Sequence, residues 1–300
     1  MSAPHRVLEA AGRRLELGDR PLIMGIVNAT PDSFSDDGAT RTLEQRVELA
    51  GSMLAAGADM IDIGGESGVT NRPPVAPEEE AERVVPLIER VTRELGVLVS
   101  VDTYKPSVAR AAIAAGASIV NDVSGLLDPG LADVCAETGA ALVVMHTRAP
   151  PKQKLLDLAY DGGVVDDVLG FLAARMEVAK ARGVASEQLI VDPGPDFAKT
   201  PAQTVEALRS LDRLHELGRP VLLAVSRKDF VGAITLRAPR QRLAGTLAAL
   251  AHGVAAGAHI LRVHDVAPAS DFLAVRAVLE GTVELDPELR LPVELRREQG

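Results

Sequence analysis

The chain has 300 residues, of which 47% are hydrophobic, 25% are charged and only 2% are aromatic, and its formal net charge at pH 7 is −10. This composition is typical of a globular protein of one large or two ordinary domains, and the negative charge argues against non-specific binding to nucleic acid. No apolar run is long enough to span a membrane, the first 20 residues lack a signal-peptide core, and the single cysteine, Cys135, excludes an internal disulfide, so we expect a cytoplasmic protein.

The two ends of the chain differ in pattern from the long middle part. Two short alternating runs, Arg6-Val7-Leu8 and Arg14-Leu15-Glu16-Leu17, lie on either side of Ala11-Gly12. We interpret residues 1–20 as a small hairpin that closes the bottom of the domain that follows. Residues 282–300 form a charged tail with scattered leucines, and their pattern assigns them to no element.

Between the two ends, a short apolar run, a polar loop and an amphipathic helix alternate eight times. The apolar runs predict buried strands at residues 22–27, 60–63, 97–101, 118–120, 141–145, 189–191, 221–225 and 260–263. The helical segments lie at residues 43–57, 78–95, 106–116, 130–138, 164–183, 201–217, 240–257 and 268–280. Eight such units predict an α/β fold, a single (β/α)8 TIM barrel over residues 21–281. A doubly wound sheet is the alternative, but it usually has fewer units.

Polar side chains follow every predicted strand, at the end where ligands bind in parallel barrels. Asp102, Asn121 and Asp192 follow the third, fourth and sixth strands. Their acceptor oxygens and amide group suit a flat heterocycle with several N–H donors. Further polar residues at strand ends are Asp62, Asp122 and His146.

Cationic side chains follow the last two predicted strands, where Lys228, Arg262 and His264 lie. Loops at this position often build the phosphate site of a TIM barrel. Arginine holds phosphate with two hydrogen bonds, and lysine adds a compact positive charge. Asn28 follows the first strand, which lies beside the eighth in a closed barrel, and can reach a Mg²⁺ ion that bridges phosphates. The pattern therefore predicts a pyrophosphate site next to the heterocycle slot.

Each of these residues also has a structural interpretation that the sequence leaves open. Asp102 and Arg262 can form a buried ion pair, because ion-pair networks also gather in barrel mouths. His146 is more typical of a hydrogen-bonded structural histidine than of a metal ligand. No Cys and His cluster has zinc spacing, and Gly64-Gly65 lacks a nucleotide-binding fingerprint.

Several motifs along the chain form a family pattern. They are MGIVNATPDSFSDDG, DMIDIGGES, SVDTYKPSVA, IVNDVSG, VVMH, VDPG, SRKDFVG and GTLAALAHGVAAGAHILRVHDV. On these motifs the chain resembles the dihydropteroate synthase family from about Pro21 to Gly281, and their joint occurrence in this order is highly specific. The resemblance implies a transferase that condenses 6-hydroxymethyl-7,8-dihydropterin pyrophosphate with p-aminobenzoate, releases pyrophosphate in folate biosynthesis, and forms a homodimer.

The resemblance also implies roles for individual residues at the pterin. Asp102, Asn121, Asp192 and Lys228 would hold the pterin ring, and Met145 would line its slot. Residues 30–34 look like the mobile first loop of the family, which orders over the substrates.

At the phosphate and the second substrate, the resemblance implies a further set of residues. Arg262 would lie over the pterin and bind phosphate together with His264, and Asn28 would bind Mg²⁺ or the pyrophosphate. Ser226 and Phe197 would border the p-aminobenzoate pocket. The catalytic groups would be Lys228, Arg262 and His264.

The chain departs from the family pattern around the rim of the predicted site. Residues 68–74 read GVTNRPP where the family usually has Thr-Arg-Pro-Gly, so Arg72 is shifted, although it can still swing toward the phosphate. Asp196 stands where the family prefers glycine, and residues 147–150 match the next loop only in part. A pterin-binding paralogue with no synthase activity or an altered second substrate is therefore an alternative. A methyltetrahydrofolate:corrinoid methyltransferase is less favoured, because it needs no pyrophosphate site.

Overall fold

The computed structural model describes residues 3–18, 20–30, 41–67, 73–153, 155 and 159–296. Its main sheet consists of β3 Leu22–Asn28, β4 Met60–Gly64, β5 Leu98–Asp102, β6 Ile119–Asp122, β7 Ala141–Met145, β8 Leu189–Asp192, β9 Leu222–Leu223 and β10 Ile260–Val263. These eight strands are parallel and lie in the order β8-β7-β6-β5-β4-β3-β10-β9. The sheet closes where Val191 of β8 bridges Val221, which directly precedes β9. The predicted (β/α)8 barrel is therefore confirmed, and the doubly wound sheet is excluded.

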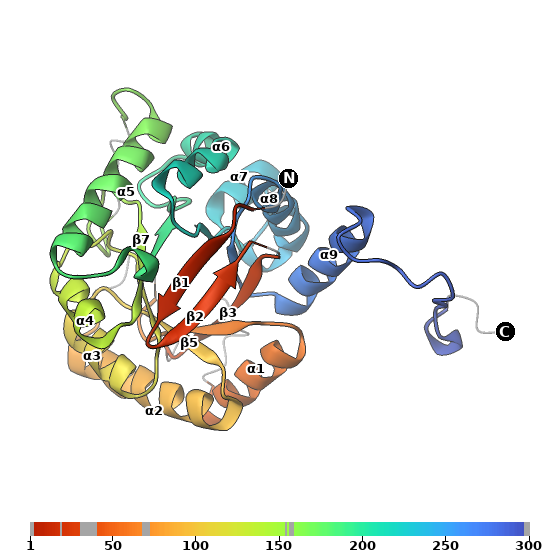
Figure 1. Ribbon diagram of the computed structural model, residues 1–300, viewed down its shortest axis with the longest axis horizontal. Helices are drawn as coiled ribbons and strands as arrows, with labels where there is room; N and C mark the ends of the chain where they lie inside the picture. Colours follow the sequence, from red (N-terminus) through yellow and green to blue (C-terminus); the bar gives the residue numbers. More distant parts are fainter. Residues whose placement is uncertain are drawn as a thin grey trace.

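Helices surround the barrel (Figure 1), and they are α1 Leu43–Ala55, α2 Pro77–Leu95, α3 Pro106–Ala114, α4 Gly130–Thr138, α5 Val164–Ala181, α6 Pro201–Arg209, α7 Asp229–Thr235, α8 Leu243–Ala255 and α9 Val266–Leu279. Short 3-10 helices lie at η1 Ser186–Gln188, η2 Leu211–Leu217, η3 Pro239–Gln241 and η4 Val293–Leu295. The start of α1 shows how the sequence fixes a boundary. The Thr42 side chain accepts from the Gln45 N–H, and the Gln45 side chain accepts from the Thr42 N–H.

The helices differ from the sequence prediction at two places. The predicted helix at 201–217 is α6 followed by η2, because the backbone leaves the α-helical region at Ser210, with φ −108° and ψ 25°. The short helix α7 was not predicted, and the predicted helix at 240–257 begins with η3 and continues as α8.

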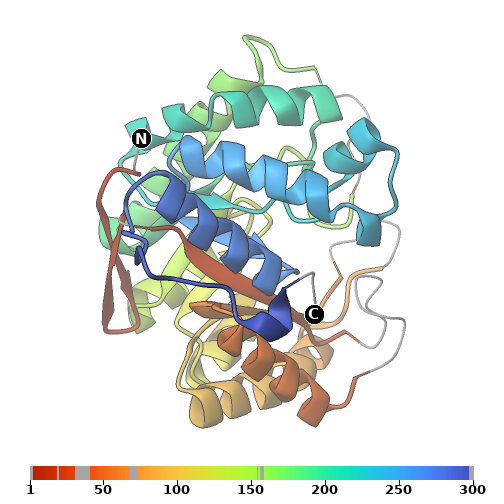
Figure 2. The same ribbon diagram turned by 90° about the vertical axis from the view of Figure 1, so that its right-hand side faces the viewer.

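Two apolar layers lie on the two faces of the strands. The interior of the barrel is filled by Met24, Met60, Leu98, Ile119, Val143, Ile190, Leu222 and Ile260, all of which are buried. Residues of the opposite parity, such as Ile61 and Val99, pack against the helices. The hairpin of β1 Arg6–Ala10 and β2 Arg13–Leu17 adds Leu8 and Leu17 to the interior layer. It therefore closes one end of the barrel (Figure 2, left), as predicted.

The C-terminal tail runs away from the barrel after α9 (Figure 1). Its large apolar side chains are exposed, including Leu289, Leu291 and Val293. Within the described residues, no helix combines the length and the apolar character that a membrane crossing requires.

Candidate active site

Strand alternation brings the predicted site residues to one end of the barrel. A residue two or four positions beyond an interior residue on the same strand also points inward. Asp62 follows Met60 in this way, and Asp102 follows Leu98. The same spacing holds for Asn28, Asn121, Met145, Asp192 and Arg262, while Ser226 and His264 follow the ends of β9 and β10 and contact each other. All of them therefore converge at the carboxyl ends of the strands, away from the hairpin.

Arg262 is the centre of a hydrogen-bonded group in this mouth. Its Nε donates to Asp62 Oδ2 at 2.6 Å, and its Nη2 donates to Asp102 Oδ2 at 2.7 Å. The Asn121 side-chain amide also donates to Asp62 Oδ2, at 3.3 Å. The ion pair of Asp102 and Arg262 that the sequence left open is thus present, and it is part of a larger network.

Asp62 is a site residue to which the sequence analysis gave no role. Its side chain is fully buried, and its Oδ1 atom has no hydrogen-bond partner within the described part of the chain. The available signal was its inward parity, because Asp62 lies on β4, between Asn28 on β3 and Asp102 on β5. A buried acceptor without a partner is costly, so it is a natural place for a ligand donor to bind.

Burial changes the acid–base properties of the carboxylates in the mouth. Desolvation raises the pKa of Asp102 to about 7, and the negative charge of Asp62 adds to this, although Arg262 opposes it. Desolvation also raises the pKa of Asp192, even though the Gly194 N–H donates to its Oδ1 at 2.7 Å. These two groups sit in a low-dielectric pocket in which a donor-rich ligand would stabilise their ionised forms.

Lys228 lies against the ring of Phe197, with its Nζ 4.3 Å from the ring centroid. Desolvation lowers the pKa of Lys228, and the negative charge of Asp196 opposes that effect most strongly. Asp196 itself has φ 65°, a left-handed conformation that explains why glycine suits this position. Its carboxylate accepts from the Phe230 N–H at 3.2 Å and so caps the start of α7. Asp196 therefore has a structural contact in addition to the charge that it brings to this rim.

Ser226 and His264 contact each other at the ends of the neighbouring strands. The His264 N–H donates to Ser226 Oγ at 3.2 Å, and His264 Nδ1 lies 3.0 Å from the same oxygen. The residues that directly follow them are also paired, because the Arg227 guanidinium donates to both oxygens of Asp265 at 3.0 and 2.6 Å. The predicted phosphate side of the site is thus built on a rigid base.

Asn28 lies at the end of β3, in register with Gly64 of β4. Across the described ranges, no three His, Cys, Asp or Glu side chains are grouped so that they could hold a metal ion. An amide oxygen fits Mg²⁺ where phosphate oxygens and water supply the other ligands. The predicted phosphate ligand Arg72 and residues 31–34 of the first loop lie outside the described residues.

Two polar residues at strand ends face away from the mouth. The Asp122 carboxylate accepts from the Ser124 and Leu126 N–H groups, at 2.7 and 2.5 Å, and so holds the turn after β6. His146 is fully buried and lies 2.8 Å from Asp167 and 2.6 Å from Lys199. The interpretation of His146 as a hydrogen-bonded histidine agrees with these contacts.

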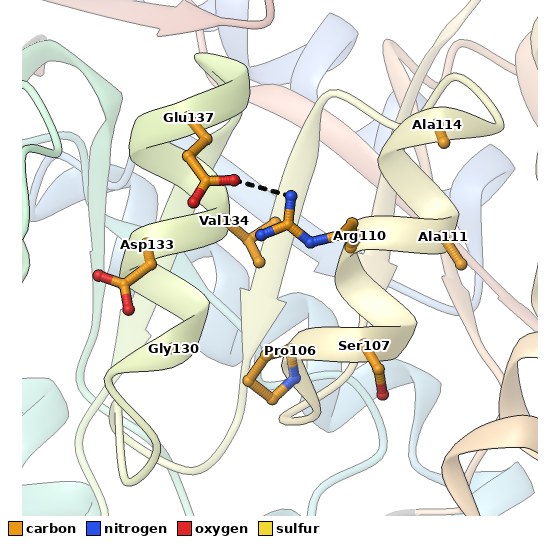
Figure 3. A pocket seen from close by; sticks show the side chains of 9 residues that line it. All are labelled: Pro106, Ser107, Arg110, Ala111, Ala114, Gly130, Asp133, Val134 and Glu137. Atoms are coloured by element: carbon orange, nitrogen blue, oxygen red, sulfur yellow. Dashed lines mark hydrogen bonds and ion pairs between the residues drawn. The ribbon is translucent and has the colours of Figure 1, made fainter.

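A groove of about 630 Å³ lies elsewhere, on the outer surface between α3 and α4 (Figure 3). Its charged lining includes Arg110, Asp133 and Glu137, and Arg110 Nη1 donates to Glu137 at 2.7 Å. The side chains of Arg110 and Glu137 are both more than half exposed, so water solvates this pair. The groove contains none of the predicted site residues, and we assign the candidate active site to the barrel mouth.

The fold is a (β/α)8 barrel with a polar, ion-paired mouth, and comparisons identify its class. A family model described as pterin binding enzyme matches residues 24–264. The dihydropteroate synthase of Bacillus subtilis is 43% identical over 262 residues, which cover 87% of this chain and 89% of that protein. The chain therefore belongs to the dihydropteroate synthase family, and it is a transferase.

A solved structure and a further relative bear on activity. Dihydropteroate synthase from Xanthomonas albilineans in complex with 7,8-dihydropteroate has a TM-score of 0.81 and 45% identity, covering 91% of this chain and 98% of that one. A Mycobacterium leprae relative is 42% identical over 88% of this chain and 92% of that protein, and it is named inactive dihydropteroate synthase 2. An assay of this chain therefore decides whether it has synthase activity or resembles the relative named inactive.

Proposed function

We propose that this chain condenses 6-hydroxymethyl-7,8-dihydropterin pyrophosphate with p-aminobenzoate, forming dihydropteroate and pyrophosphate for folate biosynthesis. The proposal rests on Arg262, which is held between the carboxylates of Asp62 and Asp102 in the barrel mouth. A cation and several acceptor oxygens in one pocket suit a flat ring that has N–H donors and an anionic substituent.

The acceptors of the mouth would bind and orient the pterin. Asp102 and Asp192 would accept hydrogen bonds from its N–H edge, Asn121 would supply an amide, and Met145 would pack beside the ring. Met145 and Asp192 are direct neighbours in register between β7 and β8. The two carboxylates would also stabilise the positive charge that spreads into the ring as the leaving group departs.

The cations on the other side of the mouth would stabilise the leaving group. The bond from the methylene carbon to the pyrophosphate oxygen breaks, the arylamine nitrogen bonds to that carbon, and the amine releases a proton to solvent. Arg262 and His264 would contact the pyrophosphate as its charge develops. Asn28 would help to hold a Mg²⁺ ion, which when bound neutralises phosphate charge.

The second substrate would bind beside Lys228, on the same side as the leaving group. The ring of Phe197 and the hydroxyl group of Ser226 would border it, and Lys228 would lie between this pocket and the pterin slot. Because Lys228 is held against Phe197, its ammonium group would orient both substrates for attack.

The test is turnover by the purified full chain with pterin pyrophosphate, p-aminobenzoate and Mg²⁺, with dihydropteroate and pyrophosphate both quantified. We expect one pyrophosphate per dihydropteroate and no turnover by Arg262→Ala. Arg182→Ala, at an exposed pair with Asp133, is the matched control and should behave as wild type. Binding of pterin pyrophosphate without product would instead identify an inactive paralogue, and unchanged turnover by Arg262→Ala would refute the assigned role.

The predicted homodimer and the cytoplasmic location are part of the proposal. Exposed apolar side chains near the end of α7 and on α9 support an interface, namely Ile234, Leu236, Val275 and Leu279. Light scattering during gel filtration should give twice the chain mass for wild type and a smaller mass for Leu236→Glu. The single cysteine is buried and unpaired, which is consistent with a reducing compartment.

A further inference from the structure

The segment from Gly194 to Lys199, directly after β8, has an unusual backbone. Gly194, Asp196 and Ala198 have φ angles of 61°, 65° and 50°, so every second residue is left-handed. Two of the three are not glycine, and such residues persist only where surrounding contacts hold them. Phe197 lies between these two residues, and its ring contacts Lys228. The contacts that hold this segment therefore also determine where Phe197 lies.

Lys199 is the internal support of the segment. Its side chain is 6% exposed, and its Nζ lies 2.6 Å from His146 Nδ1, 3.0 Å from the Gly194 carbonyl oxygen and 3.2 Å from the Phe197 carbonyl oxygen. These three acceptors match the three N–H donors of the ammonium form, although desolvation lowers the pKa of Lys199 to about 7. One buried lysine thus joins both ends of the turn that presents Phe197.

His146 connects this support to α5. Because Lys199 donates to Nδ1, the ring proton lies on Nε2 and is donated to Asp167 Oδ2 at 2.8 Å. Arg148 binds the same carboxylate. Desolvation lowers the pKa of His146 to about 4, which keeps the ring neutral and able to accept from Lys199. The segment is thus anchored through the ring of His146 to a partly buried ion pair.

Tyr160 holds the same segment from a second direction. Its hydroxyl group donates to the Ala198 carbonyl oxygen, and the Arg148 guanidinium lies 4.5 Å from the centroid of its ring. Asp196 adds a third contact at the start of α7. Three separate anchors therefore fix a six-residue segment, which is more than a connecting loop needs.

We propose that Lys199 and Tyr160 are positioning residues that fix the Phe197 wall of the p-aminobenzoate pocket, so that affinity for the second substrate depends on two side chains that do not touch it. Lys199 acts through the carbonyl oxygens of Gly194 and Phe197, and Tyr160 acts through that of Ala198. Asn121, which would hold the pterin, donates to Asp62 and not to this segment within the described residues, whereas Asp192 accepts from the N–H of its first residue, Gly194. This inference rests on the proposed function.

The main test is Lys199→Met, which keeps the apolar stem and removes the three donors. We expect the KM for p-aminobenzoate to rise about tenfold or more, because Phe197 loses its fixed position. The KM for pterin pyrophosphate, and kcat at saturating p-aminobenzoate, should change by less than about threefold. Lys180→Met, at an exposed position on α5, is the matched control. Equal effects on both KM values, or none, would overturn the proposal.

A second variant covers the possibility that Lys199→Met fails to fold. Tyr160→Phe removes only the hydroxyl group that donates to Ala198, and we expect the same selective rise in the KM for p-aminobenzoate by a smaller factor. A rise in the KM for the pterin instead would contradict the assignment.

Hydrogen exchange of the full chain without substrates separates this inference from the proposed function. The amides of residues 194–199 should exchange faster in Tyr160→Phe and Lys199→Met than in wild type, and those of β5 should not change. If wild type shows no turnover, the proposed function fails, whereas unchanged exchange at 194–199 shows that these residues do not hold Phe197.

Discussion

Arg262 is paired with the buried carboxylate of Asp62 and the partly buried carboxylate of Asp102, which predicts that Arg262→Ala and Asp62→Asn are strongly coupled. Arg262→Ala removes the only cation that donates to Asp62 in the described part of the chain, while Asp62 stays fully buried. Asp62→Asn keeps an acceptor oxygen near Arg262 but removes the negative charge. In the double variant, neither a buried cation nor the Asp62 charge is present.

The magnitude follows from burial and distance. Arg262 is 18% exposed, Asp62 is 0% exposed, and their atoms are 2.6 Å apart. Removal of one partner of such a pair costs about 3–5 kcal/mol, because the other charge stays buried without compensation. Asp62→Asn alone should cost about 1.5–3 kcal/mol, the size of a charge-assisted hydrogen bond. The double variant should lose less than the sum of the singles, with a coupling free energy of about 1–3 kcal/mol.

Urea unfolding at pH 7.5 measures the free energies of unfolding for the four proteins of the cycle, provided that their m values agree. Arg110 and Glu137 form a matched control pair, because their atoms lie 2.7 Å apart but both side chains are more than half exposed. We expect that control cycle to give a coupling of about 0–1 kcal/mol. If the Arg262 and Asp62 effects add to within about 0.5 kcal/mol, the two residues are not a buried pair, and the electrostatic account of the mouth is wrong.

Three further perturbations test other parts of the site. Because burial raises the pKa of Asp102 to about 7, above its ordinary 3.8, this carboxyl becomes an ionised acceptor only as the pH rises through 7. We expect kcat/KM for the pterin to rise with pH across that range in wild type. Asp102→Asn should have a lower kcat/KM that does not rise over the same range. Because the folded protein holds this proton more tightly than the unfolded chain, the free energy of unfolding of wild type should fall as the pH rises from about 4 to about 7. Gly194→Ala would place a Cβ atom 2.0 Å from the His146 carbonyl oxygen at φ 61°, so thermal unfolding should show a loss of at least about 1–3 kcal/mol. Chelation of Mg²⁺ should lower turnover reversibly, and Asn28→Ala should raise the Mg²⁺ concentration that restores half of the rate.

The parts of the fold that depend on repetition could be predicted from the sequence. Continuous apolar runs identify strands that are buried on both faces, and eight of them alternate with helices, so the barrel and its strand order follow. Because side chains alternate along a strand, Asp102, Asn121 and Arg262 are then expected to point into the barrel at the carboxyl ends of the strands. Helix α7 has only seven residues between Asp229 and Thr235, which is too short to show a period, and tertiary contacts such as the cap from Asp196 define its start.

Contacts between distant side chains could not be predicted in the same way. Asp62 contacts Arg262, which lies 200 positions later in the chain. The sequence does not indicate whether Asp62 or Asp102 is the partner of Arg262, because both side chains are expected to point into the barrel, and in the structure both bind it. The role of Lys199 depends on left-handed backbone at Asp196 and Ala198, which residues of these types rarely adopt. Sequence patterns report faces and periods, whereas the first contact depends on side-chain conformation across the barrel and the second on the path of an irregular loop.

Glu66 lies near the end of the second motif, and its side chain is buried and contacts several segments of the chain. Its Oε2 accepts from Lys105 Nζ at 2.5 Å and from the Val75 N–H at 3.1 Å, and its Oε1 accepts from Tyr104 Oη at 2.9 Å. Lys152, from the loop after β7, lies 3.1 Å from the same Oε1 atom. Val75 directly follows the divergent residues 68–74 in the chain, and Lys152 follows residues 147–150, so Glu66 contacts a residue close to each segment that departs from the family pattern. The predicted pterin acceptors Asp102 and Asp192 have other partners, Arg262 and Gly194, so we expect that this rim can diverge while the predicted slot is kept.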